Sequence, residues 1–338
     1  MISVGILGAS GYAGSELLRL LAAHPELEVR LAGAESQAGV AVADLYPNLA
    51  AAYPDLTFTP ATADDCDGLD LVFLGLPHGL SQEIVPKLRG RVKWIVDAAA
   101  DFRLKDPSLY DQWYGQTHPA PELLAEAAYG IPELFRGELA GADLVAVAGC
   151  YPTGAALALT PFVRSGLVET TGVIVDAASG VSGAGRPPKA HTTFASASEN
   201  MTAYGLLDHR HTPEIEQATG AQVLFTPHLV PMTRGILSTI YATPAPGASR
   251  DDLLSCLADT YASEPFVVVD DRIPQTKAVA GSNCAHLTVR HDERTGRLLV
   301  ISAIDNLVKG TSGQAIQCAN VLAGLPETTG LPLTGLLP

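Results

Sequence analysis

A glycine-rich segment near the start of the chain constrains the fold more than any other feature. Gly8–Gly14 (GASGYAG) stands between a short apolar run, Ile2–Leu7, and a stretch with helical spacing, Ala13–Ala23. Its G-x-x-G-x-x-G spacing is related to the dinucleotide fingerprint, in which glycines let the backbone approach a pyrophosphate at a helix N-terminus. A strand before the motif and a helix after it are the context that it requires. The alternative is a tight turn that binds no ligand.

Strands and helices alternate through the first half of the chain, which predicts a parallel, doubly wound α/β sheet. Leu69–Leu76 is almost continuously apolar, as a strand buried on both faces should be. The other apolar runs expected to form strands of this sheet are Ile2–Leu7, Glu28–Ala34, Val92–Val96 and Leu144–Ala148.

The pattern changes near residue 150, where strands follow one another with fewer helices between them. The chain has 338 residues, more than one domain core usually supports. We therefore expect a second, α+β domain with a mixed or antiparallel sheet. Its expected strands are Val173–Ala178, Gln222–Thr226, Ile236–Thr243, Phe266–Val269, Leu287–His291 and Leu298–Ala303. Its expected helices are Thr153–Arg164 and Asp251–Tyr261, and a last helix follows at Gly313–Ala323.

Charge and composition exclude several classes of partner. The formal net charge is −15, so nucleic acid and anionic membranes are poor partners, because both require a basic surface. No apolar run approaches the ~20 residues of a membrane helix, and no signal-peptide pattern is present at Met1–Leu7, so we expect a cytoplasmic protein. The five cysteines are widely spaced without a C-x-x-C motif, which predicts reduced thiols and no metal site.

One of these cysteines lies where a reactive thiol would be expected. Cys150 follows the apolar run that ends at Ala148 and precedes a helix expected to begin near Pro152 or Thr153. Ligands bind at the carboxyl ends of parallel strands, and a helix N-terminus favours the thiolate form of a nearby cysteine. Backbone N–H groups beside Cys150 are natural donors to an oxyanion. A thiolate beside a nicotinamide favours aldehyde oxidation or acyl phosphate reduction through a thioester; the alternative is an inert buried cysteine.

At this point the motifs resemble those of the N-acetyl-γ-glutamyl-phosphate reductases, which are related to the aspartate-semialdehyde dehydrogenases. The resemblance covers nearly the whole chain. The segments that carry it are Gly8–Gly14, Leu76–Gly79, Asp97–Leu104, Ala148–Thr153, Ser179–Arg186, His209–Ile215, Pro227–Ile236 and Asp305–Ala315.

The resemblance implies a division of the chain into two domains. Residues 1–149 together with 312–338 would form an NADP-binding Rossmann domain, which the last helix rejoins. Residues 150–311 would form the catalytic and dimerisation domain of a homodimer or homotetramer.

The resemblance also implies roles for individual residues. Cys150 is the expected nucleophile, and His209 or His211 is the acid/base, of which we choose His209. The residues expected to bind the cofactor are Gly8, Ser10, Gly11, Tyr12, Ala13, Gly14, Ser36, Pro77, Gly183 and Asn306. The residues expected to bind the anionic groups of the substrate are Arg103, Arg234 and Lys309. No metal is expected.

Two points stay open in the sequence. Glu35 lies near the end of the second expected strand, where an acid normally holds the ribose of NAD, whereas the resemblance implies NADP. The implied reaction is NADPH-dependent reduction of N-acetyl-L-glutamyl 5-phosphate to the 5-semialdehyde and phosphate, in arginine biosynthesis. The alternatives are the same chemistry on a carrier-linked aminoadipyl phosphate or on aspartyl phosphate, and a non-catalytic dinucleotide sensor.

Overall fold

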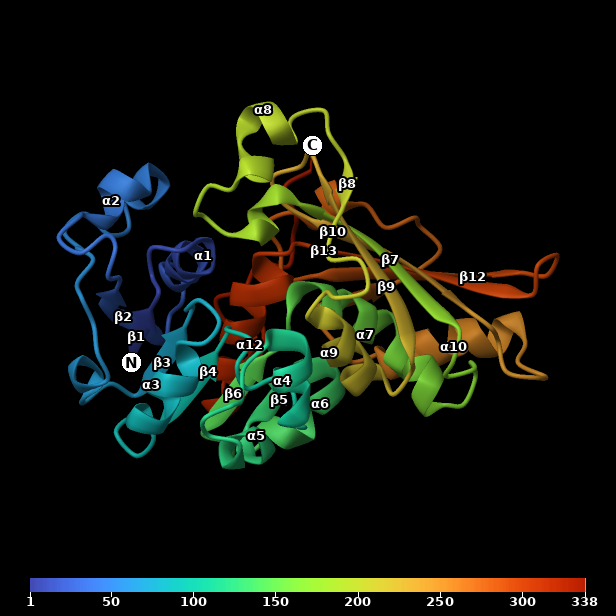
Figure 1. The fold of residues 1–338 in the computed structure, drawn as a ribbon, viewed down its shortest axis with the longest axis horizontal. Helices are drawn as coiled ribbons and strands as arrows, with labels where there is room; N and C mark the ends of the chain where they lie inside the picture. The colour runs from blue at the N-terminus through green and yellow to red at the C-terminus, as the bar shows by residue number, and fades with distance from the viewer. Residues whose placement is uncertain (338) are drawn as a thin grey trace. The chain divides into compact units, whose positions relative to one another are not determined.

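The computed structural model describes residues 1–337, which form two compact units. The first unit contains Met1–Ala148 and Thr311–Leu331, and the second contains Gly149–Gly310 and the residues from Pro332 onward. Figure 1 shows the course of the chain through its helices and strands.

The first unit is built on a six-stranded parallel sheet with the strand order β2-β1-β3-β4-β6-β5. Every residue of β3 and of β6 is buried, as expected for parallel strands covered on both faces. The strands are β1 (Ile2–Leu7), β2 (Leu27–Gly33), β3 (Leu71–Leu74), β4 (Trp94–Asp97), β5 (Ala128–Gly130) and β6 (Leu144–Val147). The helices are α1 (Tyr12–Leu21), α2 (Val42–Leu45), α3 (Ser81–Leu88), α4 (Ser108–Tyr114), α5 (Glu122–Glu126), α6 (Pro132–Leu139) and α12 (Gly313–Leu322).

The strand order reverses at β1, which has β2 on one side and β3 on the other. Ligands of open parallel sheets bind outside the carboxyl ends of the strands at such a point. The loops that follow β1 and β3 therefore flank the expected ligand crevice of this unit.

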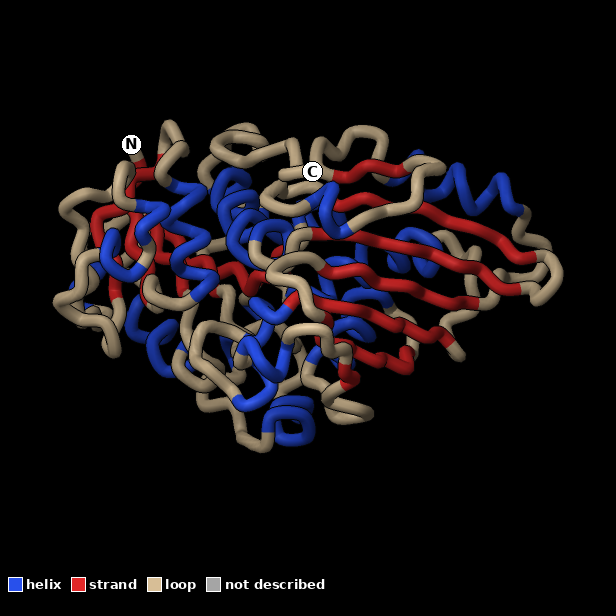
Figure 2. The backbone as a smooth tube through the Cα atoms, turned by 90° about the horizontal axis from the view of Figure 1, so that it is seen from above, coloured by secondary structure: helices blue, strands red, loops and turns tan. Residues whose placement is uncertain are grey.

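The second unit is built on a seven-stranded mixed sheet with the order β11-β12-β13-β10-β7-β9-β8. Figure 2 shows the long strands of this sheet lying side by side. The strands are β7 (Val173–Gly180), β8 (Thr202–Ala203), β9 (Val223–Val230), β10 (Ile236–Ala242), β11 (Val267–Val269), β12 (Ala285–Asp292) and β13 (Arg297–Ile304). The helices are α7 (Cys150–Arg164), α8 (Phe194–Ala197), α9 (His211–Thr219), α10 (Arg250–Thr260) and α11 (Thr276–Val279).

Buried and exposed residues alternate along β7 and β9, so one face of this sheet is covered and the other is open. Helix α7 packs against β10 and β13, and α9 packs against β9. On the open side, Leu224, Ile174 and Tyr241 are 49%, 38% and 41% exposed and are neighbours across three adjacent strands.

The predicted Rossmann-type sheet and mixed second sheet are confirmed. The structure adds elements that the sequence analysis did not predict, among them β5, β8 and the helices α8 and α11 of the second unit. Two predicted boundaries also differ. Helix α7 begins at Cys150, not at Pro152 or Thr153. The tail assigned to the first domain groups with the second from Pro332 onward, because the N–H of Asn283 donates to Pro332 O at 2.9 Å and the N–H of Leu336 donates to Ala280 O at 2.8 Å. Pro338, the last residue of that prediction, lies outside the described residues.

Candidate active site

The glycine loop of the first unit has the geometry of a dinucleotide-binding turn. Gly8 has a φ of +88°, and a Cβ there would lie 2.4 Å from Gly75 O, so only glycine fits. A Cβ at Gly14 would lie 2.4 Å from Gly8 O, so Gly14 allows the helix to pack closely on the strand. Around Gly11, by contrast, a Cβ would meet only Gly8 O, at 3.5 Å, which leaves space for a ligand.

Helix α1 begins directly after Gly11 and has no acidic residue in its first turn. The first N–H groups of a helix have no partner within the helix, and the dipole favours an anion there. Ser10, Tyr12 and Ala13 complete this turn, whose Ser10 and Ala13 carbonyls accept hydrogen bonds from Tyr46 Oη and Ser312 Oγ, both at 2.8 Å. The loop therefore fits a pyrophosphate group.

The other two cofactor residues predicted in this unit lie on exposed loops. Ser36 follows β2 and is exposed, as is Glu35. Pro77 is exposed in the loop after β3, whose Gly75 N–H donates to Leu7 O at 2.8 Å. This hydrogen bond and the close approach of Gly8 to Gly75 bring the loops after β1 and β3 together at the strand-order reversal.

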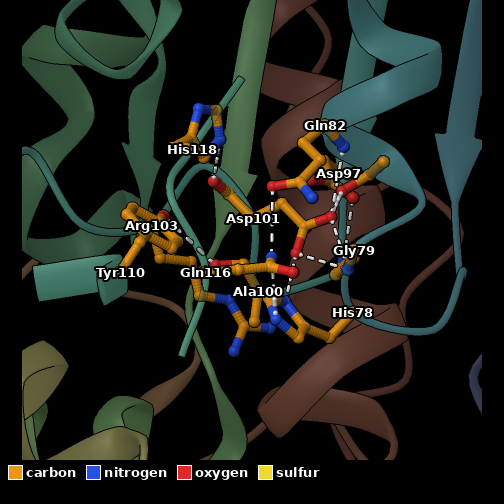
Figure 3. Close-up of polar contacts among 12 residues, drawn as sticks. His78, Gly79, Gln82, Asp97, Ala100, Asp101, Arg103, Tyr110, Gln116 and His118 are labelled. Atoms are coloured by element: carbon orange, nitrogen blue, oxygen red, sulfur yellow. Dashed lines mark hydrogen bonds and ion pairs between the residues drawn. The ribbon is translucent and has the colours of Figure 1, made fainter. Parts of the chain in front are cut away.

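A buried carboxylate, Asp101, fixes the loop that carries Pro77 (Figure 3). It accepts hydrogen bonds from His78 Nδ1 at 2.5 Å, from the Gly79 N–H at 3.0 Å and from Ser81 Oγ at 2.8 Å. It also accepts the N–H of Gln82 at 3.1 Å. Burial by itself raises the pKa of Asp101, but these hydrogen bonds outweigh burial and lower that pKa to about 2. The start of α3 is thus capped by an anion from the chain itself.

A second buried carboxyl, Asp97, lies beside Asp101, and its pKa is shifted in the opposite direction. Its Oδ1 accepts the N–H of Ala99 at 2.9 Å, and its Oδ2 has no hydrogen-bond partner among the described residues. Burial, with the charge of Asp101, raises the pKa of Asp97 to about 7. A carboxyl that ionises more readily unfolded than folded costs stability as the pH rises from about 4 to about 7.

We expect Asp97→Asn to stabilise the protein, and to do so more at high pH. The folded protein must ionise Asp97 above about pH 7, whereas an amide carries no such cost. The rise in melting temperature relative to wild type should therefore grow between pH 5 and pH 8, in thermal unfolding followed by circular dichroism. Asp55→Asn, at an exposed position, is the control and should show no such trend. A pH-independent effect of Asp97→Asn would contradict the assignment.

Arg103, predicted to bind the substrate, is buried and donates to two backbone carbonyls of its own unit. Its Nε donates to Val147 O and its Nη2 to Ala98 O, both at 2.8 Å. These carbonyls lie at the ends of β6 and β4, so Arg103 ties together the carboxyl ends of two neighbouring strands.

The second unit holds Cys150, the expected nucleophile, at the first position of its longest helix. Gly149 is the N-cap of α7, with φ −64° and ψ 157°, and Cys150 is the first helical residue. Gly149 O accepts the N–H and the Oγ1 of Thr153, each at 2.9 Å. The N–H of Gly149 donates to Glu214 Oε1 at 2.8 Å, so this particular N–H is not available to an oxyanion. The N–H groups of the helix's first turn begin at Cys150 itself.

A helical turn at residues 308–312 lies directly against Cys150. A Cβ at Gly310 would come within 2.8 Å of the Cys150 Cβ and 3.2 Å of its Cα. The N–H of Gly310 donates to Asp305 O at 2.9 Å, which holds the turn in place. Only glycine allows this approach to Cys150.

We therefore expect Gly310→Ala to lower kcat by on the order of 10²-fold, because an added methyl must displace either Cys150 or its neighbouring turn. Steady-state kinetics with a parallel melting temperature would measure it. The matched control is Gly137→Ala in α6, where nothing lies within 4 Å of the added Cβ. Equal activity of the two alanine variants would show that the turn yields to the methyl without disturbing Cys150.

The two candidate histidines come together over Tyr151, the residue after Cys150. The ring centroids of His209 and His211 are each 5.8 Å from that of Tyr151, and 4.8 Å from each other. The His211 N–H donates to His209 Nδ1 at 3.1 Å, so a neutral His209 carries its proton on Nε2. Burial, helped by the charge of Arg210, lowers the pKa of His209 to about 4.

The hydroxyl groups of two tyrosines also lie in this region. Tyr151 Oη and Tyr204 Oη are 3.0 Å apart, and Tyr151 Oη donates to His228 O at 3.2 Å. Burial raises the pKa of Tyr204 to about 12, and the charge of a Cys150 thiolate adds to that effect. Burial raises the pKa of Tyr151 as well, so both hydroxyls stay neutral.

Arg234, another residue predicted to bind the substrate, lies beside the buried side chain of Asp305. Asp305 accepts the N–H groups of Gly281 at 2.6 Å, Leu307 at 2.8 Å and Val308 at 3.0 Å, and it lies 3.6 Å from Arg234 Nη1. Arg234 is partly exposed, with 29% of its side chain accessible, as a residue that receives a ligand should be. Sequence reasoning missed Asp305 as the partner of Arg234.

Asn306, Gly183 and Lys309 are the other residues predicted for the site in this unit. Asn306 is buried; its Oδ1 accepts the Gly235 N–H at 2.7 Å and its Nδ2 donates to Ser182 Oγ at 2.9 Å. A Cβ at Gly183 would lie 3.0 Å from Ser179 Oγ. Lys309 is fully buried, with its Nζ 5.7 Å from the centroid of the Phe266 ring.

Within residues 1–337, no group of three or more His, Cys, Asp or Glu side chains is arranged to hold a metal ion. Over the same residues, every helix is too short or too polar to cross a bilayer.

Comparison with known proteins adds to this geometry. Residues 3–142 match the family described as "Semialdehyde dehydrogenase, NAD binding domain", and residues 150–306 match "Semialdehyde dehydrogenase, dimerisation domain". An N-acetyl-gamma-glutamyl-phosphate reductase of Symbiobacterium thermophilum is 50% identical, over 98% of this chain and 97% of its own. One from Desulforudis audaxviator is 49% identical over the full length of both chains.

Solved structures show the same fold at low identity. Aspartate semialdehyde dehydrogenase II of Vibrio cholerae superposes with a TM-score of 0.71 at 17% identity, covering 96% of this chain and 98% of that one. The aspartate semialdehyde dehydrogenase of Candida albicans, solved with NADP, gives a TM-score of 0.68 at 18% identity, covering 96% and 99%.

Proposed function

This chain belongs to the N-acetyl-gamma-glutamyl-phosphate reductase family, and on that premise we propose that it reduces N-acetyl-L-glutamyl 5-phosphate to the 5-semialdehyde, releasing phosphate, in arginine biosynthesis. The observation that supports this best is Cys150 at the first position of α7, with a tautomer-fixed His209 packed on the next residue. A nicotinamide dinucleotide bound at the glycine loop supplies the hydride.

The residues of the second unit account for the remaining chemistry. The Cys150 sulfur forms a bond to the acyl carbon, the bond from that carbon to the phosphoryl oxygen breaks, and phosphate leaves, which gives a thioester. When the thioester has been reduced, the carbon–sulfur bond breaks and the aldehyde departs. His209, protonated on Nε2, donates to the oxygen on which negative charge develops.

Basic residues are proposed to hold the anionic groups of the substrate. Arg234 is the best supported, because it is partly exposed and Asp305 holds one end of its guanidinium at 3.6 Å. Lys309, in the turn against Cys150, and Arg103, at the strand ends of the first unit, are the other two candidates.

We expect NADPH to be preferred over NADH, although Glu35 argues for NAD. Glu35 is exposed, and Ser36 beside it is a donor suited to a 2′-phosphate. Paired kcat/KM values for the two cofactors decide the question. A clear preference for NADH would show that Glu35 holds the ribose. Glu35→Gln should then shift the preference toward NADPH.

The open face of the second sheet supports assembly into a homodimer or homotetramer. Leu224, Ile174 and Tyr241 form an exposed apolar row across three strands, within residues that match a dimerisation domain. Sedimentation velocity of Ile174→Asp is expected to show a smaller species than wild type. An unchanged sedimentation coefficient would exclude this face.

The reverse reaction provides the test of the activity. N-acetylglutamate semialdehyde, NADP⁺ and inorganic phosphate are mixed with the enzyme, and NADPH formation is followed by absorbance. Reduction that depends on both semialdehyde and phosphate is expected. If this mixture gave no reaction but a carrier-linked aminoadipate semialdehyde did, the proposed substrate would be wrong.

A further inference from the structure

We propose that Glu214 is a positioning residue, which holds the Cys150 nucleophile in register with His209 by accepting the N–H of Gly149. This inference concerns a residue for which neither the predicted site nor the chemistry described above has a role, and it rests on the proposed function.

The contact is short and completely buried. Glu214 has no exposed surface, and its Oε1 lies 2.8 Å from the Gly149 nitrogen. The peptide on the other side of Gly149 is fixed too, because Gly149 O accepts both the N–H and the Oγ1 of Thr153. Both the N–H and the carbonyl of Gly149, the residue directly before the nucleophile, are therefore fixed by hydrogen bonds. Of these three hydrogen bonds, only the one to Glu214 involves a residue outside α7 and its N-cap.

The same helix that carries Glu214 also positions the histidine. Helix α9 begins at His211, whose N–H donates to His209 Nδ1 at 3.1 Å, and Glu214 follows within its first turn. Gly205 closes the other side, since a Cβ there would lie 2.9 Å from His209 Cδ2. The first turn of α9 thus contacts both Gly149, the N-cap of the helix that carries Cys150, and the ring of His209, the proposed acid/base.

The location also explains how a buried carboxylate is tolerated. The first turn of a helix presents the positive end of its dipole, which favours a negative side chain. A hydrogen bond from an N–H group to a carboxylate is stronger than one to a neutral oxygen. Loss of the acceptor would leave the Gly149 N–H buried and unpaired, so the start of α7 would move to satisfy it.

The variants to compare are Glu214→Ala, which removes the acceptor, and Glu214→Gln, which keeps a carbonyl oxygen at the same distance. The matched control is Thr160→Val, because buried Thr160 also makes a hydrogen bond from α7 to α9, from its Oγ1 to Ala218 O at 3.2 Å, away from the nucleophile. Should Glu214→Ala fail to fold, Glu214→Asp keeps the charge but is one methylene too short to reach Gly149.

We expect Glu214→Ala or Glu214→Asp to lower kcat by on the order of 10²-fold, with the KM for NADPH within about twofold of wild type. Glu214→Gln should recover most of kcat, and Thr160→Val should retain it. The rate of Cys150 alkylation by iodoacetamide between pH 6 and 9 should change in Glu214→Ala and not in Thr160→Val. Melting temperatures recorded in parallel measure any effect on folding.

Three results would overturn the inference: an unchanged kcat and alkylation rate in Glu214→Ala, a loss in Glu214→Gln equal to that in Glu214→Ala, or the same loss in Thr160→Val. The alkylation experiment needs no substrate. A failure of the proposed activity would therefore leave Cys150 reactivity dependent on Glu214, whereas a failure of this inference would leave the wild-type activity intact.

Discussion

Replacing Cys150 with serine is expected to lower kcat by on the order of 10⁴-fold or more, without weakening cofactor binding. The thioester requires a thiolate, and a serine hydroxyl at the same position does not ionise at neutral pH. Serine is nearly isosteric, so the approach of Gly310 to the Cβ of residue 150 is preserved. Steady-state rates of semialdehyde oxidation and fluorescence titration with NADPH measure the two effects separately.

The other cysteines provide the controls for this prediction. Cys66, Cys284 and Cys318 are buried, and burial raises the pKa of Cys66 to about 11 and that of Cys284 in the same direction. Cys256 is partly exposed, with its sulfur 3.4 Å from Ser165 Oγ on the surface. Iodoacetamide near neutral pH should label Cys150 first, and Cys256→Ser should keep full activity. Normal turnover in Cys150→Ser would rule out the thioester mechanism.

The second large effect is expected at His209. His209→Asn should lower kcat by ~10²–10⁴-fold, the usual loss for a general acid/base, with little change in the cofactor's dissociation constant. Because burial lowers the pKa of His209 to about 4, this histidine is neutral throughout the physiological range. The acid limb that it contributes to the kcat profile should therefore lie near pH 4, and not near the 6.5 of an exposed histidine.

His211 provides the matched control, because its contribution to His209 comes from the backbone. His211→Asn keeps the N–H that donates to His209 Nδ1 and removes only the ring that packs on Tyr151 and His209. We expect a loss smaller than that in His209→Asn. A larger loss in His211→Asn, or an acid limb that persists in His209→Asn, would reverse the assignment of the two residues.

The sequence predicts those parts of the molecule that are determined by residues close together in the chain. The glycine loop, the apolar parallel strands and the cysteine between a strand and a helix each depend on residues adjacent in the chain, and the fold confirms the sheets they predict. The predicted start of α7 lies two or three residues too late in the chain. Proline is common at the first helical position, but here Pro152 stands at the third.

The parts that it does not predict depend on contacts between distant segments. Glu214, Asp305 and Gly310 contact Gly149, Arg234 and Cys150, and nothing in the neighbouring sequence marks any of the three as a partner. The sequence also does not show where the rings of His209 and His211 lie. The chain turns at Arg210 into α9, and both rings pack on Tyr151.

Arg103 shows that residue type alone is an incomplete guide to the role of a side chain. An arginine after a buried strand suggests anion binding, and its role toward the substrate remains a prediction. In the first unit, its Nε and Nη2 donate to the carbonyls of Val147 and Ala98. The length of the side chain lets it reach a neighbouring strand, which no local pattern reveals.

Helix α12 has a consequence for the order in which the protein is made. It packs against α6, α1 and β4 of the first unit, and Gly313–Asn320 are buried there, including Gln317 and Asn320. Gln317 donates to Glu133 Oε1, and Asn320 Oδ1 pairs with His24, at 2.9 and 3.0 Å. A ribosome adding about 5–20 residues per second needs on the order of ten seconds to travel from Ala148 to this helix. During that time the nascent nucleotide-binding unit lacks helix α12, and the residues against which α12 packs stay uncovered. The unit should therefore depend on chaperones until synthesis is nearly complete.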